Sequence, residues 1–276
     1  MAKKQLRKLL RALPQDGRFR MADIDPDSTP GLKNPKRAIR DLKEHRAALF
    51  SLQERLYAEK KRSLLIVLQG MDTSGKDGTV THVIGGMNPE GVWITTFKAP
   101  TPEELRHNFL WRIKKRLSGP GNISLFNRSH YEDVLIARVH DLAKPQVIER
   151  RYALINQFEQ QLVRQGTTVI KFCLHISYEE QRRRLLDRLR DPDKHWKFNP
   201  HDIEERAYWD DYMSAYSLAI SNCSTAAAPW YVIPADDKDY RNWAVNRILI
   251  ETLEQMNPQY PHPRLDIPRL IAKLKA

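Results

Sequence analysis

The sequence predicts an α/β protein in which a parallel β-sheet carries helices on both faces. Five short apolar runs, rich in β-branched and aromatic residues, alternate along the chain with longer segments of helical apolar spacing. This alternation is typical of parallel sheets. Directly after the first run stands a glycine-bounded segment that ends in Gly75-Lys76-Asp77. A strand, a glycine-bounded turn and a helix in this order are typical of a phosphate-binding loop, so we expect a three-layer α/β/α fold of the P-loop type.

The predicted elements follow from the spacing of apolar residues. Strands are expected at 64–69, 92–97, 122–126, 168–175 and 230–233, which gives a five-stranded parallel sheet. Helices are expected between them at about 76–85, 102–117, 145–165, 178–190, 202–222 and 239–255. In such a fold the connections are right-handed, and ligands bind at the carboxyl ends of the strands.

The two ends of the chain differ from this alternating region. Residues 1–38 are basic and interrupted by prolines, so we expect an extended arm with at most short helices. Residues 39–60 have apolar positions at helical spacing and predict an amphipathic helix. The predicted organisation is a basic arm and amphipathic helix at 1–62, a P-loop core at 63–256 with a lid at about 178–205, and a tail at 257–276 that is basic and helical at its end.

The charge of the chain predicts a polyanionic partner. The 276 residues carry a formal net charge of +12. Residues 1–62 contain 17 Lys and Arg against 8 Asp and Glu, so most of the excess lies in the first quarter. Nucleic acid, an anionic membrane or an inorganic polyanion would each account for this excess. A solvated basic face is an equally good interpretation of charge alone.

Other features argue against several classes of protein. Only two cysteines occur, and Cys173 lies in an apolar run, which argues against a disulfide framework and favours a cytoplasmic location. The basic N-terminus lacks the continuous apolar stretch of a signal peptide, and no run has membrane-spanning length. The nine histidines show no zinc-ligand spacing.

The phosphate-binding loop departs from the common pattern at two positions. Asp77 stands where Ser or Thr usually contacts magnesium, and Asp72 lies inside the loop. A bare carboxylate there would repel phosphate unless a metal ion lay between them. We therefore assign Asp72 to Mg²⁺, with Mn²⁺ as an alternative; a chance GxxxxGK match is the competing interpretation. The predicted phosphate-binding residues of the loop are Gly70, Ser74, Gly75, Lys76, Asp77 and Gly78.

A second polar cluster follows the third predicted strand. P-loop folds place an acid that holds magnesium at a strand end beside the loop, and this chain has Asn127 there, followed by Arg128 and Glu132. Arg128 could clamp a phosphate with two hydrogen bonds or stabilise charge on the phosphoryl group in transfer. The alternative is that Asn127-Arg-Ser caps a helix and that Glu132 lies on the surface. We expect His130 and Tyr131 to be packing or orienting groups.

The region after the fourth predicted strand resembles a lid. Ser177 and Glu180 form a capping-box pattern that starts a helix with five arginines, and a proline-containing loop with Lys194, Trp196 and Lys197 follows. Small phosphoryl-transfer kinases place a mobile lid here that lays cations over the phosphoryl group and excludes water. A solvated basic helix beside a structural tryptophan is the alternative.

A further basic segment could extend the phosphate site. Arg112, Lys115 and Arg116 have the spacing of one helix face, so they could form a track for a linear polyanion together with Lys76 and the arm. A solvated helix face explains the same three residues equally well.

Together these segments resemble the polyphosphate kinase 2 family. The resemblance runs from about residue 30 to 255 and rests on several motifs in order: GMDTSGKDG, FKAPTPEEL with FLWRI, FNRSHYEDV, LHISYEEQRRRLLDRLRDPDKHWKF, WDDYMSAY and APWYVIPADDK. It implies a thymidylate-kinase-like fold with a lid, so that 63–256 is a P-loop kinase core. It also implies reversible, magnesium-dependent phosphoryl transfer between inorganic polyphosphate and nucleotides, and a dimer or tetramer.

The resemblance also implies roles for individual residues. Asp72 and Lys76 become the catalytic pair of the loop, with Asp72 on magnesium or on the acceptor phosphate. Arg128 becomes a phosphate clamp, and Glu132 a metal or nucleotide contact. The other contacts implied are Asn127 and Arg184 to the nucleotide, and Arg188 and Lys197 from the lid to polyphosphate or nucleotide. Many family members have Asp in place of Asn127, and this departure, with Glu132, resembles the branch that phosphorylates both nucleoside mono- and diphosphates.

Two other functions fit parts of the sequence. An ATP-dependent nucleoside or nucleotide kinase could use the same fold and loop. A nucleic-acid-binding P-loop protein could use the basic arm, but the arm is poor in aromatic residues, whereas single-strand binders combine basic grooves with stacking rings. We therefore expect polyphosphate and AMP, ADP or ATP as partners, guanine nucleotides as further candidates, and neither nucleic acid nor membrane.

Overall fold

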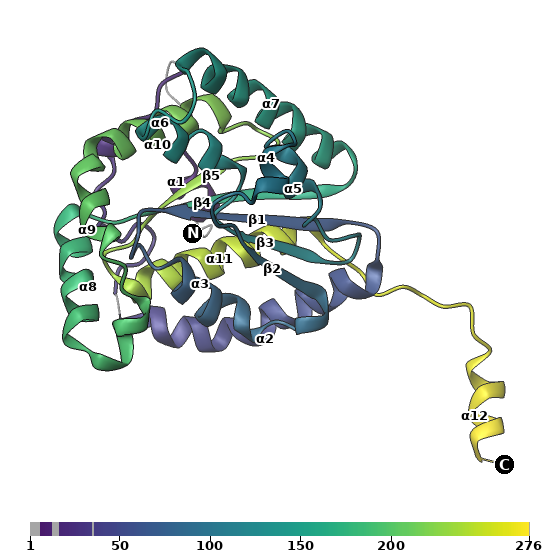
Figure 1. Ribbon diagram of the computed structural model, residues 1–276. Coiled ribbons are helices and arrows are strands. Elements are labelled where there is room, and N and C mark those ends of the chain that lie inside the picture. The colour runs from purple at the N-terminus through teal and green to yellow at the C-terminus, as the bar shows by residue number, and fades with distance from the viewer. Residues whose placement is uncertain (1–5, 13–16, 35, 276) are drawn as a thin grey trace.

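A computed structural model describes residues 6–12, 17–34 and 36–275 of the chain (Figure 1). All five predicted strands are present and form one parallel sheet in the order β2-β3-β1-β4-β5. Their bounds are β1 Ser63–Gly70, β2 Val92–Thr96, β3 Ile123–Asn127, β4 Thr167–His175 and β5 Trp230–Pro234. The central strands are buried along their length because helices cover both faces, so the predicted α/β fold is confirmed.

Two helical layers enclose the sheet. On one face lie α2 (Lys36–Glu59), α3 (Lys76–Val83) and α11 (Lys238–Met256), and on the other lie α5 (Leu110–Lys114), α7 (Pro145–Arg164) and α10 (Trp209–Cys223) (Figure 1). Each layer closes its own apolar core against alternate residues of the strands. The carboxyl ends of β1 and β3, the predicted lid helix α8 (Tyr178–Arg190) and the start of α3 meet at one end of the sheet (Figure 1).

Two predicted helices are each divided in the structure. Thr101 caps α4 (Pro102–Leu105) through a reciprocal capping box with Glu104, and Asn108 Oδ1 then accepts a hydrogen bond from Leu110 N and starts α5. The predicted 202–222 helix likewise consists of α9 (His201–Glu205), a 3₁₀ turn and α10. The remaining elements are α1 Leu6–Leu10, α6 Ile136–Val139, α12 Ile267–Lys275, and 3₁₀ turns at Met21–Asp23, Ile84–Gly86, Pro89–Gly91, His130–Asp133, Pro192–Lys197 and Arg206–Tyr208.

The described part of the N-terminal arm is packed against the core. Leu6 N and Arg7 N donate to the Glu251 carboxylate of α11, each at 3.1 Å. Arg11 bridges Tyr231 in antiparallel fashion, and Ala12 N donates to Trp230 O at 2.9 Å, so the arm covers the free edge of β5. The predicted arm also includes residues 1–5, 13–16 and 35, which lie outside the described residues. The tail ends in α12, which projects from the body (Figure 1).

No helix within the described ranges is both long enough and apolar enough to cross a membrane.

A buried ion pair lies between the sheet and α7. Lys171 Nζ on β4 contacts the carboxylate of Glu159 on α7, and it also donates to Tyr131 Oη at 2.9 Å and to Cys223 O at 2.8 Å. Glu159 accepts in turn from Tyr131 Oη at 2.9 Å and lies 3.2 Å from His130 Nε2. His130 and Tyr131 are therefore the packing and orienting groups that the sequence predicted, and they fix the chain directly after β3.

Breaking this pair should destabilise the fold. Glu159→Gln leaves the charge of Lys171 unpaired in the core, so we expect the free energy of unfolding to fall by about 3–5 kcal/mol. Chemical denaturation measures this change. The double variant Lys171→Met/Glu159→Leu removes both charges and should recover most of the loss. A single variant as stable as the wild type would contradict the assignment.

Candidate active site

The phosphate-binding loop spans the end of β1 and the start of α3. Gly75 caps α3 with φ of 101°, in the left-handed region that favours glycine. A side chain at Gly70 would meet Leu174 O at 2.6 Å, so this position also requires glycine. Lys76 is buried, and its Nζ donates to Gly70 O at 2.7 Å and to Met71 O at 3.1 Å. The loop therefore holds the ammonium group inside its own curve, where a phosphate would meet it.

Arg128 lies at the mouth of this loop between two carboxylates. Its backbone adopts a left-handed φ of 60°, and its N donates to Leu68 O at 3.0 Å. Its guanidinium lies 2.8 Å from Asp72 Oδ1 and 3.9 Å from Glu132 Oε2. A non-glycine residue in this conformation is strained and persists only where its surroundings hold it. The structure thus brings together Asp72, Lys76, Arg128 and Glu132, the four residues predicted to be catalytic.

The pKa values of these groups respond to burial and to one another. Burial opposes ionisation of Asp72, but Lys76 and Arg128 outweigh it and hold the pKa of that carboxyl below its usual range. Burial raises the pKa of Glu132 in spite of Arg128 and Lys76. Burial lowers the pKa of Lys76, and Asp72 only partly compensates. The two carboxyls beside Arg128 therefore differ: Asp72 is held ionised more firmly than Glu132.

Several buried oxygen atoms near the loop lack a protein partner. Asn127 Nδ2 donates to Asp77 Oδ1 at 2.8 Å, which leaves Asn127 Oδ1 without a hydrogen bond within the described ranges. The hydroxyl oxygens of Thr73, Ser74 and Thr79 also have no hydrogen-bond partner among the described residues. Buried polar atoms are normally paired, so these oxygens fit a site that is completed by phosphate, water or a hydrated cation.

The oxygen donors at the loop suit a hard cation such as Mg²⁺ or Mn²⁺. Within residues 6–12, 17–34 and 36–275, no group of three or more His, Cys, Asp or Glu is placed to hold a metal by itself. Mg²⁺ usually keeps several waters and binds through one or two carboxylates together with substrate phosphates. Asp72 and Glu132 can supply those carboxylates, although both also contact Arg128.

The predicted lid helix α8 begins as expected but is stabilised differently. Ser177 Oγ accepts from Glu180 N at 3.1 Å, so the cap is present. The second half of the predicted capping box is absent, because Ser177 N donates to Asp236 Oδ1 at 2.8 Å. The Glu180 carboxylate instead pairs with Arg183 and Arg184.

Arg184 ties the lid helix to the phosphate-binding loop. It is buried, and its Nη1 donates to Thr73 O at 2.9 Å. Its Nη2 donates to Ala235 O at 2.6 Å and to Asp236 O at 2.8 Å. All these acceptors belong to the protein, so the geometry gives Arg184 a positioning role; the nucleotide contact predicted from the sequence stays a prediction.

The rest of the predicted lid segment faces an open cleft of about 930 Å³ above the loop. Arg188 Nη1 donates to Lys197 O at 3.1 Å and lies 3.6 Å from Asp202 Oδ2. Lys194 and Trp196 line the same cleft, and the Trp196 side chain is 79% exposed. The predicted lid residues Arg188 and Lys197 are thus gathered at the cleft together with Asn127 and Arg128.

The predicted basic track does not form as expected. Arg112 is buried; its Nη1 donates to Lys98 O at 2.8 Å, and its guanidinium faces Glu104 at 3.7 Å and Asp133 at 3.9 Å. Because α5 ends at Lys114, Lys115 and Arg116 lie beyond the helix. None of the three predicted track residues Arg112, Lys115 and Arg116 lines the cleft. The expectation of a shared exposed face was wrong for Arg112, because local carboxylates and Phe97 enclose its guanidinium.

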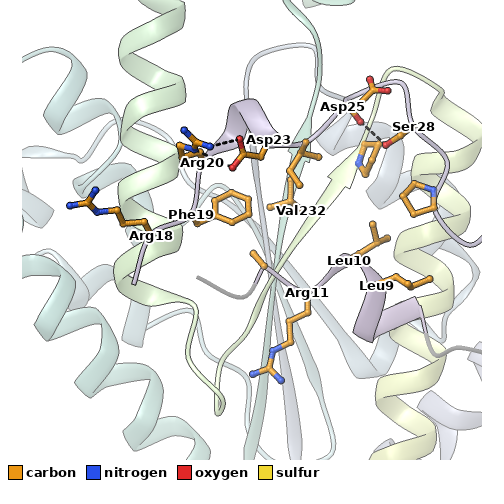
Figure 2. Close-up of a pocket in the computed structure, with 14 residues that line it drawn as sticks. Leu9, Leu10, Arg11, Arg18, Phe19, Arg20, Asp23, Asp25, Ser28 and Val232 are labelled. Atoms are coloured by element: carbon orange, nitrogen blue, oxygen red, sulfur yellow. Dashed lines mark hydrogen bonds and ion pairs between the residues drawn. The ribbon is translucent and has the colours of Figure 1, made fainter. Parts of the chain in front are cut away.

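A larger hollow, of about 1180 Å³, lies beneath the N-terminal arm (Figure 2). Arg20 pairs with Asp23 at 3.1 Å. Figure 2 shows Arg11 and Arg18 pointing in different directions, away from each other. Because these cations do not converge, the hollow lacks the features of a phosphate site, and the cleft at the loop remains the candidate active site.

The sequence reasoning missed some cleft residues. Arg241 and Asn242 of α11 line the cleft, as do Lys43 and Arg46 of α2. The available signal was a basic residue in the first turn of the helix that follows the fifth strand, at the end of the sheet where ligands bind.

Residues 33–261 match the family model described as Polyphosphate kinase 2 (PPK2). The chain belongs to this family. It is 49% identical over 249 residues to the AMP/ADP-polyphosphate phosphotransferase of Meiothermus ruber, covering 90% of this chain and 93% of that one. It is 44% identical to the ADP-polyphosphate phosphotransferase of Rhodopseudomonas palustris, covering 77% and 78%. The crystal structure of Polyphosphate Kinase 2 from Arthrobacter aurescens TC1 superposes with a TM-score of 0.95 at 46% identity, covering 99% and 97%.

Arg184 and its neighbour Arg183 allow a matched test of the contact between α8 and the phosphate-binding loop in this PPK2 chain. Arg184→Gln removes bonds to Thr73 O and the β5–α11 connection, so we expect the affinity for inorganic triphosphate to fall about tenfold. Arg183→Gln removes an exposed guanidinium whose ion pairs among the described residues are with Glu180 and Asp187, and it should change affinity by less than about twofold. Calorimetric titration measures both, and equal effects would contradict the role of Arg184.

Proposed function

We propose that this protein transfers phosphoryl groups reversibly between inorganic polyphosphate and the nucleotides AMP and ADP in a magnesium-dependent, in-line reaction. The chain is a PPK2-family phosphotransferase, and the observation that carries the finer proposal is the cluster of Asp72, Lys76, Arg128 and Glu132 at a phosphate-binding loop. The name of the Meiothermus ruber relative, an AMP/ADP-polyphosphate phosphotransferase, supports both nucleotides as acceptors.

The proposed reaction needs no covalent enzyme intermediate. A terminal phosphate oxygen of AMP or ADP attacks the end phosphorus of polyphosphate, and the bond from that phosphorus to its bridging oxygen breaks. The nucleotide gains one phosphoryl group, and polyphosphate leaves one unit shorter. In such transfers positioning and charge stabilisation supply most of the catalysis.

The residues at the loop have different roles in this reaction. Lys76 donates to phosphate oxygens once they replace Gly70 O and Met71 O, its present acceptors. Arg128 can turn from Asp72 toward the phosphoryl group in transfer, where a guanidinium forms two parallel hydrogen bonds. Asp72 and Glu132 would hold Mg²⁺, which when bound neutralises phosphate charge. The loop amides, with Ser74 and Gly78, hold the chain of phosphates.

The lid completes the proposed site. Arg188, Lys194 and Lys197 already line the cleft, and closure over the substrates would exclude water and so favour transfer over hydrolysis. In this proposal the chain consists of a basic arm with an amphipathic helix at 1–62, a P-loop kinase core at 63–256 with a lid at about 178–205, and a tail at 257–276. It also includes a cytoplasmic location and a homo-oligomer.

Formation of ATP tests this function. The protein, Mg²⁺ and long-chain polyphosphate should produce ATP from ADP, and ADP followed by ATP from AMP. Lys76→Ala should reduce the rate by at least about 100-fold, because a preorganised cation is lost at the phosphates. A luciferase assay follows ATP, and chromatography separates the nucleotides. No product from either nucleotide, together with phosphorylation by ATP, would favour the ATP-dependent kinase instead.

The metal assignment has its own test. Asp72→Asn should reduce the rate by about 100-fold or more and require a higher Mg²⁺ concentration for half-maximal rate, because a carboxylate ligand becomes neutral. Asp133→Asn is the matched control, since Asp133 faces Arg112 and Arg151 away from the cleft. An active Asp72→Asn enzyme with unchanged Mg²⁺ dependence would remove the assignment.

A further inference from the structure

Arg241 is a buried cation in the first turn of α11, directly behind the phosphate-binding loop. Its side chain is 3% exposed, yet it contributes to the wall of the cleft. Nη1 donates to Ser74 O at 3.3 Å, and Nε and Nη2 donate to Asn242 Oδ1 at 3.2 and 2.9 Å. The side chain therefore links the loop to α11 without closing the cleft.

The guanidinium occupies the space left empty by the absence of side chains at Gly75 of the loop and Gly78 of α3. A Cβ at Gly75 would lie 1.8 Å from Arg241 Nη1, and a Cβ at Gly78 would lie 3.1 Å from Nη2. No side chain thus separates the charge of Arg241 from the backbone at Gly75 and at Gly78. The bond to Ser74 O also polarises the peptide group that ends in Gly75 N–H, which strengthens that group as a hydrogen-bond donor.

The charge of Arg241 lacks the compensation that its neighbours have. Arg128 pairs with Asp72, and Arg184 pairs with Glu180. Over the described ranges Arg241 forms no ion pair; Asp237 and Asp239 act on it only from a distance, and Arg184 repels it. A buried charge without a partner is unfavourable unless something else neutralises it.

This imbalance makes the free protein less stable. Burial, reinforced by Arg184, lowers the pKa of Arg241 to about 10, well below the usual range for arginine. Because the folded pKa lies below that of the unfolded chain, the unfavourable contribution is fully present at neutral pH, where both states are protonated. It would be relieved only as pH rises through the folded pKa. A bound polyanion can relieve it at neutral pH.

We propose that Arg241 is a positioning residue for the donor, which strengthens polyphosphate binding by placing an uncompensated positive charge behind Gly75. This inference rests on the proposed function, in which polyphosphate occupies the loop. It implies that Arg241 contributes affinity for the donor's phosphates at the expense of stability in the free protein. We expect binding of the nucleotide acceptor to depend on Arg241 much less, because polyphosphate, and not the nucleotide, is proposed to occupy the loop.

The test compares charge with packing at one position. Arg241→Met removes the charge and retains much of the volume, and Arg241→Lys keeps the charge. Arg247→Met is the control, because Arg247 lies on the same helix and pairs with Glu251 away from the cleft. For each protein, calorimetry gives the dissociation constant for inorganic triphosphate, and thermal unfolding is recorded with and without it. Steady-state kinetics give KM for polyphosphate and for ADP.

For Arg241→Met we expect about tenfold weaker triphosphate binding and a similar rise in KM for polyphosphate, with KM for ADP within about twofold. Its melting temperature without ligand should equal or exceed that of the wild type, and the rise caused by triphosphate should shrink. Arg241→Lys should stay within about threefold of the wild type, and Arg247→Met should bind triphosphate like the wild type. Arg241→Gln is the second neutral variant if Arg241→Met does not fold.

Two results would overturn the inference. One is a neutral variant with a lower melting temperature and unchanged triphosphate affinity, which would make Arg241 a structural brace. The other is an equal loss of affinity in Arg241→Lys and in the neutral variant, which would mean that charge is not the cause. A wild-type protein that does not use polyphosphate would refute the proposed function instead, and the triphosphate affinities would still decide the role of Arg241.

Discussion

A lysine and a glutamate meet between the sheet and α7, where neither side chain reaches water. Lys171 and Glu159 are 0% and 1% exposed, and a buried pair of this kind is held in place by its geometry, because either charge alone would be unfavourable there. Through Tyr131 and His130 the pair fixes the chain directly after β3. The strained backbone of Arg128 lies at this point. The core thus holds the turn that places Arg128 above the loop.

In the candidate active site, as in the core, contacts between charged side chains and the backbone hold the chain in place. Arg128 lies between Asp72 and Glu132, and Lys76 is held by loop carbonyls. Arg184 and Arg241 support the back of the loop through Thr73 O and Ser74 O. Lys171 and Glu159 balance each other in the core, whereas the cations that line the cleft outnumber the acids that line it. A phosphate chain would supply the missing negative charge, so the loop is built for a ligand that the fold itself does not provide.

The sequence predicted the parts of this site that depend on local pattern. The five strands and the glycine-bounded loop were found because apolar periodicity and glycine conformation act over a few residues. The contacts between distant segments could not be found in this way. Arg184 and Thr73 are 111 residues apart, and Arg241 and Ser74 are 167 apart. Arg112 was misjudged for the same reason, because its carboxylate partners come from α4 and from the turn after β3.

The structure shows where part of the basic excess of the chain is used. Part of the charge of the arm is used within the fold: Arg7 donates to Tyr231 Oη, and Arg11 donates to Thr225 O. The described part of the arm, residues 6–12 and 17–34, covers the edge of β5, and none of these residues lines the cleft. The cations at the cleft come from α2, the loop, the segments after β2 and β3, the predicted lid and α11. Because these elements converge only in the folded chain, affinity for a polyphosphate end would depend on tertiary structure more than on net charge.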